Sequence, residues 1–137
     1  MVKDFWINLP VKNVHLSKAF FSSLGFTFHV TQSDPKTSAC FIFGEKGIVL
    51  MLFSEPVFEK FTKNKIPNAQ LENEVLLSIG AESKSEVDEL FQKVKENSGI
   101  IISAPGDNQG WMYGGVFADP DGHRWNVLFM DMDKMPK

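Results

Sequence analysis

The residues best placed to do chemistry in this 137-residue chain lie on one face of four predicted strands. Successive side chains of a strand point to opposite faces of a sheet, and one of these faces would line a shared cavity. That face carries Trp6, Asn8, Met51, Phe53, Leu76, Ser78, Asn126 and Leu128. None of the eight is His, Asp, Glu or Cys, so the face predicts a binding site of apolar and amide groups without catalytic residues.

Three members of this set are polar: Asn8, Ser78 and Asn126. Buried polar groups usually have hydrogen-bond partners, which leaves two interpretations open. The three side chains bond each other, water or the backbone, or they orient a bound molecule. In the second case the surrounding ligand-binding side chains would be Trp6, Phe43, Phe53, Trp111 and Tyr113.

The histidines and the cysteine, which are common catalytic residues, fit structural roles better than catalytic ones. His123 follows Asp119, Pro120 and Gly122 in a DPDGH run, where Asp and Pro predict a type I turn and Gly takes the left-handed position. We therefore favour a structural role for His123 over a catalytic one.

The other histidines and the cysteine give no nucleophile and base pair. His29 lies in a predicted strand and favours a surface or half-buried position, and His15 lies beside a helix start, where we expect it to be solvated. Cys40 lies on a predicted inner strand and is expected to behave as a small apolar residue. We expect no catalytic residue among them.

The first half of the chain predicts a strand, a helix and three further strands. Asn13 is a plausible N-cap and Gly25 a C-cap for the helix. The expected strands and helix are Phe5–Val11, Val14–Leu24, Thr27–Thr31, Ser38–Phe43 and Ile48–Phe53.

The second half repeats this order after a polar stretch. Residues 55–74 are expected to form a linker with room for one helical turn, whose Phe58 and Phe61 could serve as a lid or a dimer contact. Ser83 and Glu86 form a capping box for the second helix. Its buried stripe is Val87, Leu90, Phe91 and Val94, and the strands are 75–81, Ile100–Ser103, Gly114–Ala118 and Arg124–Met130.

This order predicts an α+β fold of two tandem βαβββ units, in which curled mixed sheets surround a cavity and the helices lie outside. We expect one domain over residues 1–137, with unit 1 at about 4–54, the linker at 55–74 and unit 2 at about 75–131. The outward face of each sheet is apolar because a helix covers it.

The composition argues against two classes of binding partner. The net charge is −3 and basic residues are scattered among acidic ones, so neither nucleic acid nor an anionic membrane is an expected partner. The chain has no apolar run long enough for a signal peptide or a membrane span. A single cysteine fits a reducing compartment, which makes the cytoplasm the expected location.

Two sequence runs carry a family resemblance. GGVFADPDGHRW (114–125) resembles the last hairpin of the vicinal oxygen chelate superfamily, which includes glyoxalase I, the bleomycin-resistance proteins and the extradiol dioxygenases. NLPVKNVHLSKAFFSSLGF (8–26) is similar to its first strand and helix. SACFI (38–42) and WMYG (111–114) are similar to the predicted lactoylglutathione lyases, and the resemblance covers essentially the whole chain.

The resemblance also implies where a metal would bind. Metal-dependent relatives take His, Gln and Glu ligands from the first and last strands of each unit, and these positions fall on Trp6, Met51, Leu76 and Asn126. Indole, thioether and alkyl groups cannot hold a divalent ion against water, and a lone amide oxygen is a poor ligand. We therefore expect no metal and no other cofactor.

Three functions remain open. The favoured one is metal-free binding of a small apolar or aromatic organic molecule, as the resemblance to bleomycin-resistance proteins implies. The second is a metal-dependent glyoxalase-type lyase or isomerase similar to lactoylglutathione lyase. The third is a structural or interaction protein that fills its cavity with its own side chains. The resemblance also implies a homodimer.

Overall fold

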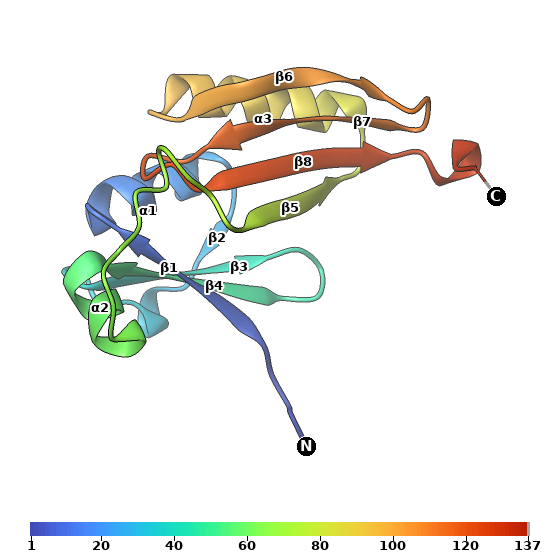
Figure 1. Cartoon of the computed structure of the whole chain (residues 1–137). Helices are drawn as coiled ribbons and strands as arrows, with labels where there is room; N and C mark the ends of the chain where they lie inside the picture. Colours follow the sequence, from blue (N-terminus) through green and yellow to red (C-terminus); the bar gives the residue numbers. More distant parts are fainter. Residues whose placement is uncertain (137) are drawn as a thin grey trace. The chain divides into compact units, whose positions relative to one another are not determined.

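The computed structural model describes residues 1–136 and has an α+β fold of two βαβββ units, Met1–Pro67 and Asn68–Lys137. Each unit contains one open sheet of four strands, and each sheet combines one parallel strand pair with antiparallel pairs (Figure 1). Within residues 1–136, no helix has the length and apolar character needed to cross a membrane.

In unit 1 the strand order is β1-β4-β3-β2, with β1 parallel to β4. Its elements in chain order are β1 (Trp6–Val11), α1 (Val14–Ser23), β2 (Thr27–Phe28), the 3-10 turn η1 (Val30–Gln32), β3 (Ser38–Phe43), β4 (Ile48–Ser54) and α2 (Glu55–Thr62).

Helix α1 begins where the sequence predicts, because the Asn13 side chain accepts a hydrogen bond of 2.9 Å from the backbone N–H of Leu16. Its apolar side packs on one face of the sheet. There the Phe21 ring lies 5.8 Å from that of Phe41, and Leu50 is almost fully buried. These aromatic and aliphatic side chains form the core of unit 1.

Two segments of unit 1 differ from the prediction. The strand predicted over Thr27–Thr31 stops at Phe28, after which the chain turns into η1. The Ser33 hydroxyl donates to the carbonyl of His29 and accepts from the N–H of Cys40, and such local bonds compete with strand pairing. The predicted linker contains two turns of helix, α2, with Pro56 in the first turn, where its missing N–H costs nothing.

In unit 2 the strand order is β5-β8-β7-β6, with β5 parallel to β8. Its elements are β5 (Leu76–Ala81), α3 (Lys84–Glu96), β6 (Ile100–Asn108), β7 (Met112–Ala118), β8 (Arg124–Met130) and the 3-10 turn η2 (Met132–Lys134). Ser83 caps α3 as predicted, because its hydroxyl accepts from the N–H of Glu86 at 3.1 Å.

The core of unit 2 lies between α3 and its sheet. The Phe91 ring contacts that of Phe117 edge-on with centroids 5.8 Å apart, and Phe117 stacks on Trp125. Val87 and Val94 are fully buried beside them, whereas Leu90, predicted in the same stripe, is only half-buried. The stripe is therefore narrower than the sequence pattern indicates.

Strand β6 is longer than predicted. The prediction ended at Ser103, but pairing with β7 continues past Pro105 and Gly106 to Asn108. The register shifts twice, between Ile101 and Ser103 and again before Gly106. β6 is an edge strand, and an irregular edge accommodates a proline that a central strand would exclude.

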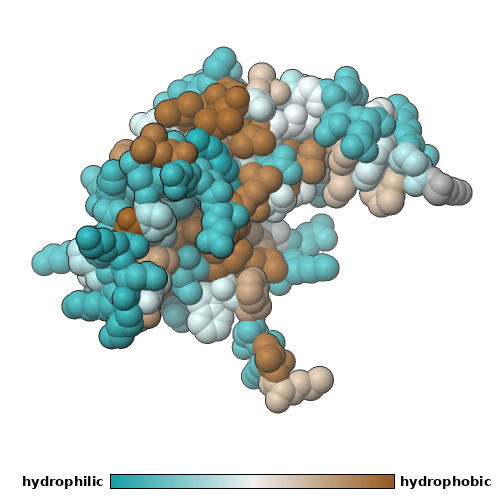
Figure 2. Space-filling view, viewed as in Figure 1, coloured by the Kyte–Doolittle hydropathy of each residue, from teal (hydrophilic) through white to brown (hydrophobic). Residues whose placement is uncertain are grey.

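The segment that leads into β1 exposes apolar side chains (Figure 2). Phe5 is 77% exposed and Trp6 is 52% exposed. An aromatic pair at a strand start that is open to solvent is available to a ligand or to another chain.

Candidate functional site

Four predicted binding residues share the face of the unit 1 sheet that is opposite α1, and we call Trp6, Asn8, Met51 and Phe53 the unit 1 open face. Parallel pairing of β1 with β4 places Asn8 beside Met51. Trp6 and Asn8 are exposed, and Met51 and Phe53 are half-buried. The Phe61 ring of α2 contacts Phe53 edge-on at 5.2 Å, so α2 covers the Phe53 end of this face.

The other four share a face of the unit 2 sheet, and we call Leu76, Ser78, Asn126 and Leu128 the unit 2 open face. Parallel pairing of β5 with β8 places Ser78 beside Asn126. In the part of unit 2 that the structure describes, α3 is the one α-helix, and it packs on the opposite face with Trp125 and Val127. The expectation that the two open faces line one cavity concerns the placement of the units and stays a prediction.

The polar residues of unit 2 bond to each other. The Asn126 side-chain amide donates to the Ser78 hydroxyl oxygen at 3.2 Å. This geometry leaves the Asn126 carbonyl oxygen as an acceptor and the Ser78 O–H as a donor. The first interpretation, mutual bonding, therefore holds for this pair. The pair still presents an acceptor, the Asn126 carbonyl oxygen, and donors, the Ser78 O–H and the second Asn126 N–H, to a ligand.

Phe43 does not belong to the predicted site. Phe43 lies two positions after Phe41 in β3, and alternate residues of a strand point to the same face. Its side chain is therefore on the α1 side of the sheet, like that of Phe41. Its ring is 4.2 Å from that of Phe26. This contact holds the half-buried Phe43 on the helix-covered face of unit 1, so the structure does not bring it together with the predicted residues of the open face.

Tyr113 also points away from the open face. It shares a strand face with Phe117, on the α3 side, and its hydroxyl donates to the Asp88 carboxylate of α3 at 2.6 Å. That hydrogen bond is the largest cause that raises the pKa of Tyr113, followed by desolvation and the charges of Asp88 and Asp107. The Lys84 ammonium lies 5.4 Å from the ring centroid. Tyr113 therefore ties β7 to α3.

Trp111 lies in the hairpin between β6 and β7. Its backbone carbonyl accepts from the N–H of Asp131 at 2.7 Å, which joins this hairpin to the end of β8. The indole N–H is buried and has no hydrogen-bond partner among residues 1–136. The backbone of Trp111 is thus fixed by the hairpin, outside the strands that form either open face.

The positions where the resemblance implies metal ligands do not fit a metal. Trp6, Met51, Leu76 and Asn126 offer an indole, a thioether, an alkyl group and an amide. Hard or borderline divalent ions prefer carboxylate, imidazole or thiolate donors, so this set does not suit them. Among residues 1–136, no three His, Cys, Asp or Glu side chains gather as an ion would require.

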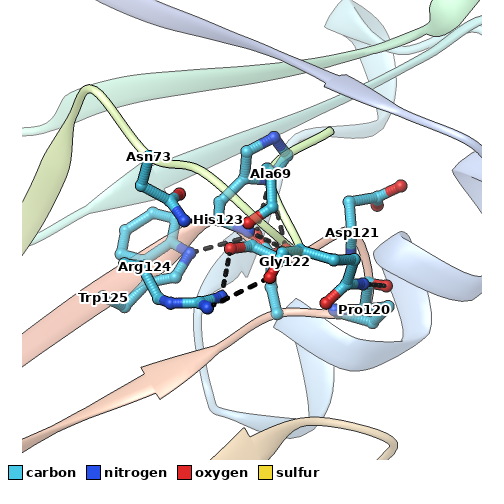
Figure 3. A network of polar contacts seen from close by, with 10 residues as sticks. Ala69, Asn73, Pro120, Asp121, Gly122, His123, Arg124 and Trp125 are labelled. Atoms are coloured by element: carbon cyan, nitrogen blue, oxygen red, sulfur yellow. Dashed lines mark hydrogen bonds and ion pairs between the residues drawn. The ribbon is translucent and has the colours of Figure 1, made fainter. Parts of the chain in front are cut away.

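The turn between β7 and β8 is built on Asp119, which is buried. Figure 3 shows other residues of this turn, among them Pro120, Gly122, His123 and Trp125. The Asp119 carboxylate accepts from the backbone N–H groups of Asp121 and His123 at 3.0 and 3.1 Å. It also bonds His123 Nδ1 at 2.9 Å and Trp125 Nε1 at 3.1 Å. One carboxylate thus organises the whole turn, which supports the structural role expected for His123.

Two opposing effects set the pKa of His123. Burial is the largest and lowers the pKa, because it disfavours the imidazolium. The hydrogen bond to Asp119, the Asp119 charge and the Asp121 charge all raise it, and together they outweigh burial. The net pKa of His123 therefore lies above its ordinary value.

Gly122 lets a distant segment approach this turn. Its φ is +95°, as predicted for the left-handed position, and a Cβ there would lie 2.6 Å from the backbone N of Gln70. Gln70 donates from Nε2 to the Pro120 carbonyl, and Arg124 donates to the carbonyls of Gly122 and Gln70. Sequence reasoning missed this contact because about fifty residues separate the partners.

The remaining reactive side chains are dispersed. His29 is half-buried and its Nδ1 lies 3.0 Å from the Thr31 hydroxyl. Cys40 is 3% exposed, and burial raises the pKa of its thiol. A buried neutral thiol is a poor nucleophile, in accord with the structural role expected for Cys40.

Comparisons with known proteins agree with this architecture. The profile of the Glyoxalase/Bleomycin resistance protein/Dioxygenase superfamily matches residues 5–127. A hypothetical protein from S. aureus is similar over 94% of both chains, with 31% identity and a TM-score of 0.83. No curated protein matches the sequence.

Two further solved structures share the fold at low identity. A lactoylglutathione lyase from Agrobacterium tumefaciens is 16% identical, with 98% of each chain covered and a TM-score of 0.65. A fosfomycin resistance protein from Listeria monocytogenes, solved with Mn(II) and a dihydroxypropylphosphonic acid, is 17% identical, with 93% of this chain and 90% of that chain covered and a TM-score of 0.68. The profile match spans most of the sequence, so the chain belongs to the Glyoxalase/Bleomycin resistance protein/Dioxygenase superfamily.

Proposed function

We propose that this chain binds a small, flat apolar or aromatic organic molecule on its open faces without a metal of its own. The observation that carries the proposal is the chemistry of the four positions Trp6, Met51, Leu76 and Asn126. They replace the ligands that metal-dependent relatives use with groups that contact apolar molecules. The fold therefore keeps its binding surface while the metal-dependent reaction loses its electrophile.

The open faces have the composition of a small-molecule site. Trp6 supplies a rigid ring that is half-exposed, and Met51 beside Asn8 supplies an adaptable thioether. On unit 2 the Ser78 and Asn126 pair supplies hydrogen-bond donors and an acceptor. Apolar surface with a few fixed polar groups is how such sites obtain both affinity and orientation.

Metal binding is the first measurement that tests the proposal. The purified protein is analysed for bound elements and then titrated by calorimetry with nickel, zinc, manganese and ferrous ions. We expect no stoichiometric binding. One-to-one binding of any of these ions at micromolar affinity, or lactoylglutathione lyase turnover with the metal added, would contradict the proposal.

Ligand binding is tested with indole and 2-naphthol as flat aromatic probes. We expect saturable shifts of the amide signals of Trp6, Asn8, Ser78 and Asn126, a raised unfolding temperature and no chemical change of the probe. Trp6→Ala should weaken binding, whereas Leu16→Ala, on the exposed side of α1, should not. Equal effects of the two variants would show that the open face is not the site.

We also propose that the chain is a cytoplasmic homodimer. The exposed aromatic and aliphatic groups Phe5, Phe61 and Val75 support a contact with a second copy, since they are unfavourable in water. Light scattering during size exclusion measures the molar mass directly. A mass equal to that of one chain at micromolar concentration would exclude a stable dimer.

A further inference from the structure

Unit 1 contains a pocket of about 150 Å³ whose lining shares no residue with the unit 1 open face or the unit 2 open face. It lies where the first turns of α1 meet β2, η1 and the start of β3. Val14, Phe28, Val30 and Pro35 form its apolar walls. Its polar lining consists of His15, Lys18, Ser33 and Ser38, none of which is acidic.

The charge around this pocket is opposite in sign to that of the whole chain. Between Phe5 and Gly44 the sequence has Lys12, Lys18 and Lys36 but a single acidic residue, Asp34. The Asp34 carboxylate accepts from the backbone N–H of Lys36. The region is therefore net positive within a chain of net charge −3, which favours an anion over a cation in the pocket.

Lys18 is held in place for such an anion. Its ammonium lies 4.2 Å from the centroid of the Phe28 ring, a cation–π geometry that fixes the side chain at the pocket wall. Lysine binds anions as a compact point charge with several donors, and the ring contact occupies one side of the ammonium only.

The two hydroxyls that line the pocket have different hydrogen-bond states. Ser33 both donates and accepts within the chain, so its hydroxyl is already used. Ser38 is buried and accepts from the N–H of Asp34 at 3.1 Å, which leaves its own O–H as a donor. Ser38 and Lys18 are thus two donors that an anionic group can use.

We propose that this pocket binds a small organic anion, specifically a carboxylate with a compact apolar body of one ring. A volume of about 150 Å³ is below the range of about 300–1,000 Å³ that is typical for drug-sized ligands, but it is enough for a single benzene-sized group. The ring would contact Phe28 and Val30, and the carboxylate would bond Lys18 and Ser38. This site is independent of the open faces and of the function proposed for them.

The test uses the full chain, labelled with nitrogen-15, and sodium benzoate as the probe. Benzamide serves as the neutral probe of the same shape, at constant ionic strength. We expect benzoate to produce saturable shifts at the amides of His15, Lys18, Val30 and Ser38. The dissociation constant should be on the order of 1 mM, as expected for a ligand of this size. Benzamide should bind about fivefold more weakly because it lacks the charge.

Two variants and a matched control sharpen the result. Lys18→Met keeps the apolar stem and should weaken benzoate about fivefold while leaving benzamide unchanged. Val30→Trp, at an exposed position of η1, should fill the pocket and abolish binding of both probes. Lys46→Met removes the same charge from the turn between β3 and β4 and should have no effect.

Four results would overturn the proposal. The first is no saturation of these amides through tens of millimolar benzoate, and the second is equal affinity for benzoate and benzamide. The third is benzoate binding that Lys18→Met and Lys46→Met weaken equally. Shifts confined to Trp6, Asn8 and Asn126 would likewise refute this pocket while supporting the open faces, so the failure of one proposal is distinguishable from that of the other.

Discussion

Removal of the Asp119 carboxylate should strongly destabilise unit 2, because several donors of the turn between β7 and β8 depend on this one group. Asp119 is 2% exposed and accepts from His123 N, His123 Nδ1 and Trp125 Nε1, all in buried surroundings, and from the partly buried N–H of Asp121. A buried donor left without an acceptor costs about 1–3 kcal/mol. The donors share one group and their losses are not additive, so Asp119→Ala should cost about 3–5 kcal/mol.

The isosteric variant should be milder. Asp119→Asn retains one carbonyl oxygen, which can still accept the two backbone bonds that Oδ1 accepts. It places an N–H₂ group against the Trp125 indole N–H, where two donors face each other. We therefore expect a loss of about 2–3 kcal/mol, smaller than that of the alanine variant.

Urea unfolding measures both values, with tryptophan fluorescence and the amide signals of β7 and β8 as probes. Asp133→Asn is the matched control, because it removes the same charge from an exposed side chain of η2. It should change the free energy of unfolding by less than about 0.5 kcal/mol. If Asp119→Ala falls within that same margin, the carboxylate does not hold the turn and the argument fails.

Three further predictions use single titratable groups. The pKa of His123 is raised in the folded state, so its contribution to stability is complete below its ordinary value of 6.5 and is lost as the pH rises through the folded-state value. Unit 2 should therefore lose stability from about pH 6.5 upward, and His123→Gln should flatten this dependence in urea unfolding curves. Tyr113 is the single tyrosine, so absorbance at alkaline pH should show its raised pKa directly, and Asp88→Asn should lower that pKa. Cys40 should react with a disulfide reagent at least about a hundredfold more slowly in the folded protein than in urea, and equal rates would show that unit 1 opens readily.

The order of the elements could be predicted because local signals agree with the fold. The side chains of Asn13 and Ser83 cap α1 and α3 at the residues that their sequence positions indicate. The pattern Asp-Pro-Asp-Gly gives a turn because Gly122 adopts a positive φ that other residues rarely adopt. These features depend on residues within a few positions of one another, which a single sequence displays.

The structure differs from the expected site where the face of an aromatic residue had to be chosen. Phe43 and Tyr113 have rings that suit either a core or a ligand site, so their residue type does not decide the face. The alternation of side chains along a strand does decide the face. Tyr113 lies an even number of residues from Phe117 in β7, and Phe43 lies two residues from Phe41 in β3, so each pair points to the same face. Both partners are core residues, so alternation assigns both rings to the helix side. The Gln70 and Arg124 contacts depend on tertiary approach and had no local signal.

The side chains that maintain the fold are separate from the positions where the resemblance implies metal ligands. The largest fully buried side chains of the strands lie on the helix-covered faces, as Phe41 and Phe117 show, and the turn is held by Asp119. Trp6 and Asn126 lie on the opposite faces and are at least partly exposed. Substitution there leaves the core contacts intact, because the strand backbone positions the side chain without depending on its chemistry. A scaffold of this kind can carry apolar side chains at these positions at little cost in stability, so the complete superfamily fold is compatible with a set of side chains unsuited to a metal.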